Sequence, residues 1–210
     1  MKIALINEVS QASKNGIVLE QLQKVADENN HVVYNVGMTD AEQKPVVSYI
    51  HLGLMACILL NSKAVDFVVT GCGTGQAACI SLNNYPGVLC GLVTEPTDGY
   101  LFVQINNGNA ISLPYAKGFG WGAELNIYNI FEKTFSCERG SGYPPERREV
   151  QQKFKIWLDQ TKEIVNRDVM TILSSIDRGL LKECCASKNF QDCLYQNAQV
   201  SEITDFIKNL

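Results

Sequence analysis

Residues 65–75 constrain the fold and chemistry of this chain more than any other stretch. The first part, residues 65–69, is a short apolar run rich in β-branched residues, as in a strand buried on both faces of a parallel sheet. Cys72 and Thr74 then alternate with three glycines, Gly71, Gly73 and Gly75. Because glycine can adopt a positive φ and leaves backbone N–H groups uncovered, this loop is suited to hold an anion.

The composition argues against several classes of protein. The chain has 210 residues, of which 46% are hydrophobic and 19% charged, as in an ordinary globular chain with a well-buried core. The net charge of −4 and the pI near 5.2 do not suit a nucleic-acid partner, which favours a basic face. The longest apolar run, residues 52–60, is shorter than the roughly 20 residues of a membrane span, and no signal-peptide pattern is visible. We expect a cytoplasmic protein with no nucleic-acid or membrane partner.

The cysteines and histidines do not form a metal-binding pattern. Eight cysteines without a secretory context are expected to be reduced. Three of them lie near the C-terminus, but they lack the Cys-x-x-Cys spacing and a nearby histidine; they are Cys184, Cys185 and Cys193. We expect His31 at the surface, whereas His51 is either a pocket residue or a packed core or interface residue.

Apolar runs and helical periodicities alternate along the first part of the chain. The predicted strands are residues 2–6, 31–34, 65–69, 88–92 and 110–113. The predicted helices are residues 17–28, 46–60, 76–82, 96–105 and 122–135. Alternation at this spacing indicates an α/β fold, a Rossmann-like, doubly wound sheet of five parallel strands, for which we expect the order 2-1-3-4-5.

A second, helical part follows this domain. Residues 138–145 contain two glycines and two prolines and are typical of a linker or turn. We therefore divide the chain into a Rossmann-like domain, residues 1–145, and a C-terminal helical extension, residues 146–210. Apolar residues at helical spacing predict a long amphipathic helix within residues 146–177 and another near the C-terminus, which are expected to pack on the domain or on a second subunit.

The predicted topology brings two polar segments together. In such a sheet the ligand crevice lies at the carboxyl ends of the first and third strands, where we find Asn7 and Glu8 on one side and residues 71–75 on the other. A carboxylate, a thiol, a hydroxyl and free amides suit the removal of a proton next to a carbonyl, with N–H donors stabilising the enediolate. The N-terminus of the following helix would favour the thiolate of Cys72.

Two other interpretations of the glycine loop remain open. A nucleotide-binding loop uses similar glycines, although it normally follows the first strand of the sheet. Cys72 could also be an ordinary small core residue, because free cysteines are commonly buried.

Several motifs together resemble a known enzyme family. They are residues 65–75, Asn83, Pro86-Gly87, Glu95-Pro96 and Gln104-x-Asn106-x-x-Asn109. Over residues 1–150 the chain is similar to the ribose-5-phosphate isomerase B and galactose-6-phosphate isomerase family. The resemblance implies a homodimer or homotetramer with active sites shared between subunits, and no metal or cofactor. It also implies interconversion of phosphorylated aldoses and ketoses through an enediol.

The resemblance assigns roles to individual residues. Cys72 matches the general base of the family, and Thr74 with the amides of Gly73 and Gly75 matches its anion hole. The implied substrate-binding set is Asn7, Glu8, Tyr49, Gly71, Gly73, Gly75, Asn106, Lys117 and Arg147. Within it, Glu8 replaces the usual aspartate that binds sugar hydroxyls, Asn106 comes from the partner subunit, and Arg147 binds phosphate.

The chain also departs from the family pattern. Ile105 and Val9 stand where the family has histidines, the first of which opens the sugar ring. Tyr143 replaces a phosphate-binding arginine, and Lys117 is the cation nearest to the position of another. As an aldose–ketose isomerase, the protein would therefore either open the ring of a cyclic sugar with some other group or act on an open-chain or short sugar phosphate. The alternative is a sugar-phosphate-binding protein of the same fold that has lost catalysis.

Overall fold

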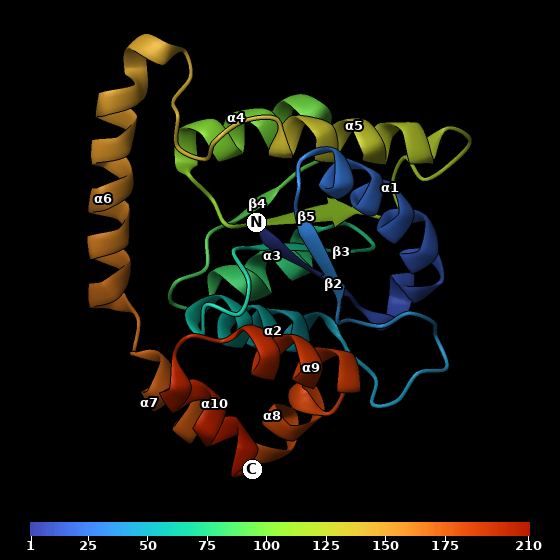
Figure 1. Cartoon of the computed structure of the whole chain (residues 1–210), viewed down its shortest axis with the longest axis vertical. Coiled ribbons are helices and arrows are strands. Elements are labelled where there is room, and N and C mark those ends of the chain that lie inside the picture. Colours follow the sequence, from blue (N-terminus) through green and yellow to red (C-terminus); the bar gives the residue numbers. More distant parts are fainter.

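A parallel sheet of five strands forms the centre of the protein (Figure 1). The computed structural model describes all residues, 1–210. The strands are β1 (Lys2–Asn7), β2 (Val32–Asn35), β3 (Phe67–Cys72), β4 (Cys90–Leu92) and β5 (Ala110–Pro114). The predicted α/β class, parallel strands and helical C-terminal part are confirmed, and the predicted strands lie within a few residues of the observed ones.

Helices cover both faces of the sheet. The helices that alternate with the strands are α1 (Asn15–Glu28), α2 (Tyr49–Asn61), α3 (Gln76–Asn83), α4 (Pro96–Asn106) and α5 (Ala123–Phe135). Helices α1, α4 and α5 pack on one face, and α2 and α3 pack on the other (Figure 1). A short 3₁₀ helix, η1 (Val9–Lys14), follows β1 where the sequence indicated only a polar turn.

The order of the last two strands differs from the prediction. The observed order is β2-β1-β3-β5-β4, so β5 lies beside β3 and β4 forms the edge. Strand β4 has only three residues and one partner, whereas β5 is mostly buried and pairs on both sides. The crevice between β1 and β3 is unaffected, because β1 and β3 remain neighbours and lead to helices on opposite faces.

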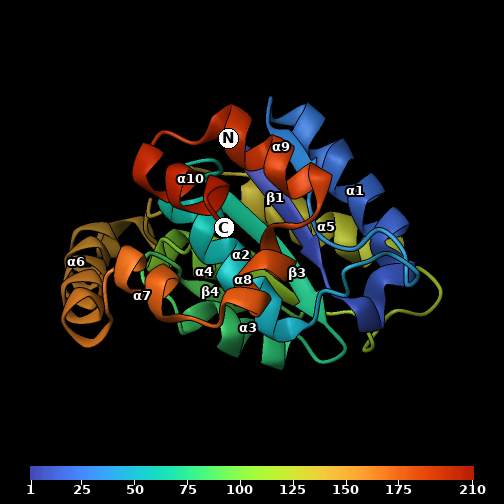
Figure 2. The same cartoon turned by 90° about the horizontal axis from the view of Figure 1, so that it is seen from below.

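Helix α2 lies between the sheet and the C-terminal extension. Nine consecutive residues, His51 to Leu59, are buried, which requires apolar cover all round the helix. The cover comes from the extension, which contains α7 (Val169–Ser175), α8 (Arg178–Cys185), α9 (Lys188–Asn197) and α10 (Ser201–Lys208). Seen from below, α8 and α10 lie over α2, and α9 packs toward β2 (Figure 2). Buried residues of the extension, such as Leu181 and Phe190, share one hydrophobic cluster with β1, α2 and β3.

Helix α6 (Arg148–Val165) stands beside the body of the molecule (Figure 1). It follows a 3₁₀ turn, η2 (Pro145–Arg147), and contains no fully buried residue. The prediction of one long helix within residues 146–177 is wrong, because α6 ends at Val165. Asp168 begins α7 instead: its carboxylate accepts the Thr171 N–H at 2.9 Å, as expected of an N-cap.

None of the helices combines the length and hydropathy of a membrane-spanning segment.

Candidate active site

The carboxyl ends of β1 and β3 lie side by side, so two of the predicted segments meet. Asn7, the last residue of β1, is the register partner of Gly71 on β3. Cys72 ends β3 and is 7% exposed. The backbone of the next loop is fixed by β5, because Tyr115 donates its N–H to the Cys72 carbonyl at 3.0 Å and Ala116 donates to the Gly73 carbonyl at 2.9 Å.

The fold requires glycine at two of the three glycine positions in this loop. A Cβ on Gly71 would lie 2.3 Å from the Tyr115 ring, and Gly75 has a φ of 73° as N-cap of α3. Both positions therefore require glycine for the fold itself. Gly73 does not, because a Cβ there would meet nothing closer than Ala116 Cβ at 3.6 Å and Gln11 Nε2 at 3.7 Å. The fold itself therefore does not require glycine at position 73.

The loop presents unpaired hydrogen-bond donors. The backbone N–H groups of Gly73, Thr74 and Gly75 have no acceptor within the chain. The exposed Thr74 hydroxyl accepts only a long bond, 3.4 Å, from the Gln76 N–H. Together with the N-terminus of α3, these donors form a site for a negatively charged oxygen.

The pKa of most of the other thiols is shifted from its usual value. Burial raises the pKa of Cys57, Cys185 and Cys193 to about 12 and the pKa of Cys184 and Cys90 above the usual value. A hydrogen bond with Cys90 lowers the pKa of Cys79 to about 7, and the Cys79 thiol donates to the Cys90 carbonyl at 3.4 Å. Burial raises the pKa of Tyr115, and the adjacent Cys72 thiol raises it further.

The polar residues after β1 are held in place by η1. Glu8 is almost fully buried and caps η1, with its carboxylate accepting the Ser10 N–H at 2.8 Å and the Ser10 hydroxyl. Asn7 donates from Nδ2 to Asn15 Oδ1 at 2.8 Å, but its own buried Oδ1 has no partner. An unpaired buried oxygen at a sheet edge is costly and needs a donor from outside the chain.

Tyr49 and Lys117 also lie at this carboxyl edge. Tyr49 begins α2 and is 48% exposed, two residues after Val47, whose carbonyl accepts the Val9 N–H at 2.8 Å. Lys117 is exposed in the loop that follows β5, next to the Ala116 contact with the glycine loop.

Lys14 is a further candidate site residue, which no sequence motif indicated. Its ammonium group donates to Gln11 Oε1 at 2.9 Å and to the Tyr115 carbonyl, and it lies 4.5 Å from the centre of the Phe119 ring. These contacts place the Lys14 ammonium group at the carboxyl edge of the sheet, between β1 and the loop after β5. The signal in the sequence was a lysine within the polar segment after the first strand, which carries no motif of its own.

Asn106 and Arg147 lie at the opposite, amino edge. Asn106 ends α4, and three residues later the Asn109 carbonyl accepts the Val68 N–H at 3.0 Å, near the start of β3. At about 3.3 Å per residue, Cys72 is roughly 13 Å further along the strand. Arg147 is exposed in η2, near the Gly142 N–H that bonds the Gln104 carbonyl of α4 at 3.1 Å. The two residues are therefore not brought to the Cys72 loop of their own chain.

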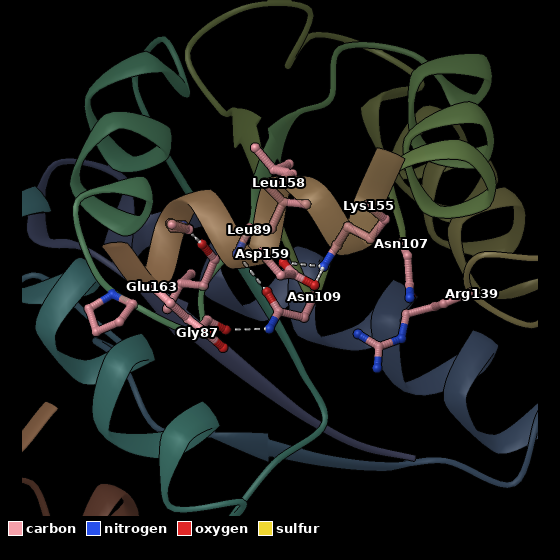
Figure 3. Close-up of a pocket in the computed structure, with 12 residues that line it drawn as sticks. Gly87, Leu89, Asn107, Asn109, Arg139, Lys155, Leu158, Asp159 and Glu163 are labelled. Atoms are coloured by element: carbon pink, nitrogen blue, oxygen red, sulfur yellow. Dashed lines mark hydrogen bonds and ion pairs between the residues drawn. The ribbon is translucent and has the colours of Figure 1, made fainter. Parts of the chain in front are cut away.

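The amino edge contains a pocket of about 350 Å³ between α6 and the sheet (Figure 3). It is lined by charged groups, of which Lys155 and Asp159 form an ion pair with Nζ and Oδ1 2.6 Å apart. Arg139 donates to the Gly108 carbonyl at 3.3 Å, and Asn109 bonds the backbone of Gly87 and Leu89. This pocket is separate from the Cys72 loop.

Comparison with protein families is decisive for the fold and the enzyme class. The family model described as Ribose/Galactose Isomerase matches residues 3–142. The chain belongs to this isomerase family. The protein is thus a sugar isomerase, an intramolecular oxidoreductase. A second family model, described as ribose-5-phosphate isomerase, matches residues 164–210 of the isomerase.

Solved structures agree with this assignment. A ribose-5-phosphate isomerase from Vibrio parahaemolyticus is 55% identical, with a TM-score of 0.97, and the match covers 100% of this chain and 98% of that one. A 4-deoxy-L-threo-5-hexosulose-uronate ketol-isomerase complexed with a tartrate is 48% identical, with the same coverage and TM-score. Both therefore include the C-terminal extension of this isomerase.

More distant structures share only the fold of the first part. A ribose 5-phosphate isomerase from Thermotoga maritima is 22% identical, with a TM-score of 0.58, and the match covers 76% of this chain and 97% of that one. The isomerase thus belongs to a longer branch of the family. Comparison with curated protein sequences gives no match.

Proposed function

We propose that this isomerase moves hydrogen between adjacent carbons of a small acidic sugar through an enediolate, with Cys72 as the general base. The observation that carries the proposal is the position of Cys72. The thiol ends a buried strand and directly precedes three unpaired amides.

The proposed reaction balances within the substrate. The Cys72 thiolate takes the proton from C2 of the aldose, and the C–H electron pair forms the C1=C2 double bond as O1 becomes negative. The N–H groups of Gly73 and Gly75 and the Thr74 hydroxyl stabilise that oxygen. The thiol then returns its proton to C1, and the O2 proton passes to O1 as the C2 carbonyl forms, so that O1 ends as the hydroxyl of the ketose.

Residues after β1 suit the sugar hydroxyls. A substrate hydroxyl can donate to the unpaired Asn7 Oδ1, which removes the cost of the buried oxygen. Glu8 offers a carboxylate held rigidly by Ser10, and Tyr49 adds an exposed ring to the wall.

We propose that the substrate is an open-chain sugar acid. Ile105 and Val9 replace the histidines expected of a ring-opening enzyme, and Tyr143 replaces a phosphate-binding arginine. The substrate named for the 48% identical ketol-isomerase is a 4-deoxy-5-keto acid. It lacks the hydroxyls at carbons 4 and 5 through which an aldohexose closes its ring on C1. Such a substrate needs no ring opening at C1.

Lys14 and Lys117 are the proposed partners of the substrate's anionic end. An ammonium group has three N–H donors, and Lys14 uses two within the chain. The third remains for a carboxylate or phosphate oxygen.

We propose further that the active form is a homodimer, or a tetramer built from dimers, with shared sites. Asn106 and Arg147 are exposed at the edge opposite Cys72. In a dimer with twofold symmetry, the amino edge of each subunit can face the carboxyl edge of its partner, which gives two equivalent sites. Each site would then receive these two side chains from its partner.

Solvent exchange tests the role of Cys72. The Cys72→Ala variant is incubated in D₂O with 4-deoxy-5-keto-uronate or with ribose 5-phosphate, and deuterium at C2 is followed by NMR. We expect exchange and turnover to be lost while ligand binding persists, with the uronate the better wild-type substrate. Cys79→Ala is the matched control and should remain active. Exchange retained by Cys72→Ala would exclude Cys72 as the base. Wild-type binding without turnover of any tested sugar acid or sugar phosphate would favour the binding-protein alternative.

A further inference from the structure

His51 is a buried residue that the proposed mechanism does not use. It lies in the first turn of α2, is 8% exposed, and uses both ring nitrogens. Nδ1 lies 3.1 Å from the Ser48 backbone nitrogen and 2.9 Å from the Ser48 hydroxyl, and Nε2 lies 3.1 Å from Glu183 Oε2.

These contacts determine the tautomer of the ring. A backbone N–H can only donate, so Nδ1 must accept from Ser48. The ring hydrogen is therefore on Nε2, where it is donated to the Glu183 carboxylate. By accepting that hydrogen, Glu183 supports the tautomer and the ring orientation that hold the Ser48 N–H.

The turn held by His51 belongs to the wall of the candidate site. Val47, next to Ser48, accepts the Val9 N–H at 2.8 Å, and Val9 directly follows Glu8. On the other side of Ser48 is Tyr49. A shift of this turn would therefore move Tyr49 relative to Glu8.

Glu183 belongs to the extension, far from this turn in sequence. Its helix α8 packs on α2, and the next residue, Cys184, is buried with its thiol 3.9 Å from the His51 carbonyl. Two consecutive residues of α8 thus contact one residue of α2. The Glu183 side chain itself is 57% exposed, so its bond to His51 adds little to global stability.

The same three residue types occur in hydrolase triads, but the arrangement differs. The Ser48 hydroxyl takes part in a capping box with the His51 backbone N–H. It is part of a helix cap and is not available as a nucleophile.

We propose that Glu183 is a positioning residue for the isomerisation: through His51 it fixes the turn that carries Tyr49 into the wall of the site. The C-terminal extension thereby acts on the active site as well as covering α2. The inference rests on the proposed location of the site, and its test must separate the two.

The test compares Glu183→Ala with Glu183→Gln. The amide oxygen of glutamine can still accept from His51 Nε2, whereas alanine cannot. We expect Glu183→Ala to lower kcat/KM about tenfold, mainly through KM, and Glu183→Gln to recover most of the loss. Asp192→Ala is the control, because it removes another exposed ion pair of the extension, with Lys188, that lies away from His51. It should match the wild type in kcat and KM.

A second measurement does not depend on turnover. The chain has two histidines, so the ¹⁵N shifts of both rings can be assigned with His31 as the internal reference. We expect a pure Nε2–H tautomer for His51 in the wild type and a mixture in Glu183→Ala. Calorimetry with tartrate as the probe should give weaker binding for Glu183→Ala than for Asp192→Ala.

Specific results would overturn the proposal. One such result is that Glu183→Ala equals the wild type in both kcat/KM and tartrate affinity. Another is that Glu183→Gln recovers none of the lost kcat/KM. A third is that the His51 tautomer in Glu183→Ala is the same as in the wild type. Absence of wild-type turnover would instead refute the proposed function, and the tautomer and tartrate measurements would still decide the role of Glu183.

Discussion

Mixing two inactive variants tests whether the active sites are shared between subunits. Cys72→Ala removes the proposed base at the carboxyl edge, and Asn106→Ala removes an exposed amide at the amino edge. Because Asn106 is exposed at the end of α4, its replacement should leave the fold intact. Each variant alone should be inactive or nearly so.

The expected recovery follows from the separation of the two edges. If a site uses Cys72 of one chain and Asn106 of its partner, a mixed dimer has one site with both defects and one site with neither. Random exchange of equal amounts makes half of the dimers mixed, so about a quarter of all sites are intact. The specific activity should rise to about a quarter of the wild-type value, and to about half in mixed dimers purified through two different tags.

The assay is the conversion of aldose to ketose after subunit exchange in mild denaturant. A matched negative control mixes Cys72→Ala with Thr74→Ala, because both residues lie in one loop and every site then keeps one defect. Wild-type protein carried through the same exchange gives the reference activity.

An absence of recovery would refute the shared site. If Asn106 acted within its own chain, every site in every mixture would lack either the thiol or the amide. The separation of roughly 13 Å along β3 would then have to be closed by a rearrangement of α4.

Three further predictions follow from the contacts of single residues. Lys14→Met should raise KM for acidic substrates about tenfold with little change in kcat, while Lys24→Met, on the exposed face of α1, should have no effect on the steady-state kinetics. Gly73→Ala should keep the melting temperature but lose turnover, because its Cβ fits the fold and covers the anion site; Gly71→Ala should cost about 1–3 kcal/mol in urea unfolding through its collision with Tyr115. If Gly71→Ala were as stable as Gly73→Ala, the tight packing against Tyr115 would be refuted. The free energy of unfolding should fall above about pH 9. In the folded state burial raises the pKa of several thiols to about 12, whereas in the unfolded chain the same thiols ionise. A urea midpoint that is unchanged between pH 8 and pH 10 would contradict this. These thiols are Cys57, Cys185 and Cys193.

The sequence was sufficient for the elements of the sheet and for the position of the glycine loop. Apolar runs followed by turn residues identify β1 and β3 because a buried strand has no polar face to interrupt the run. The same logic could not order β4 and β5, since both are short and apolar in sequence. Their order depends on which strand has a partner on both sides, a property of tertiary packing that no local pattern carries.

The candidate site was predictable where motifs exist and not where contacts are made at long range. Cys72 and Thr74 follow from the glycine pattern, and their roles remain predictions. The position of Lys14 depends on its bond to the Tyr115 carbonyl, 101 residues further along the sequence. The family resemblance assigned Asn106 to the partner subunit, but only the fold reveals how far it lies from Cys72 in its own chain.

The composition of α2 links the extension to the site. A helix that is apolar all round must be covered on every side, and here β3, α3 and α8 pack on α2, while buried residues of α9 and α10 belong to the same hydrophobic cluster. The extension therefore belongs to the same core as the strands that end at Asn7 and Cys72. Because α8 supplies both the buried Cys184 and the exposed Glu183, the helix that closes the core also reaches the turn beside Tyr49. A substitution at Glu183 can change that turn without removing buried apolar contacts, so positioning and stability are separable in this extension.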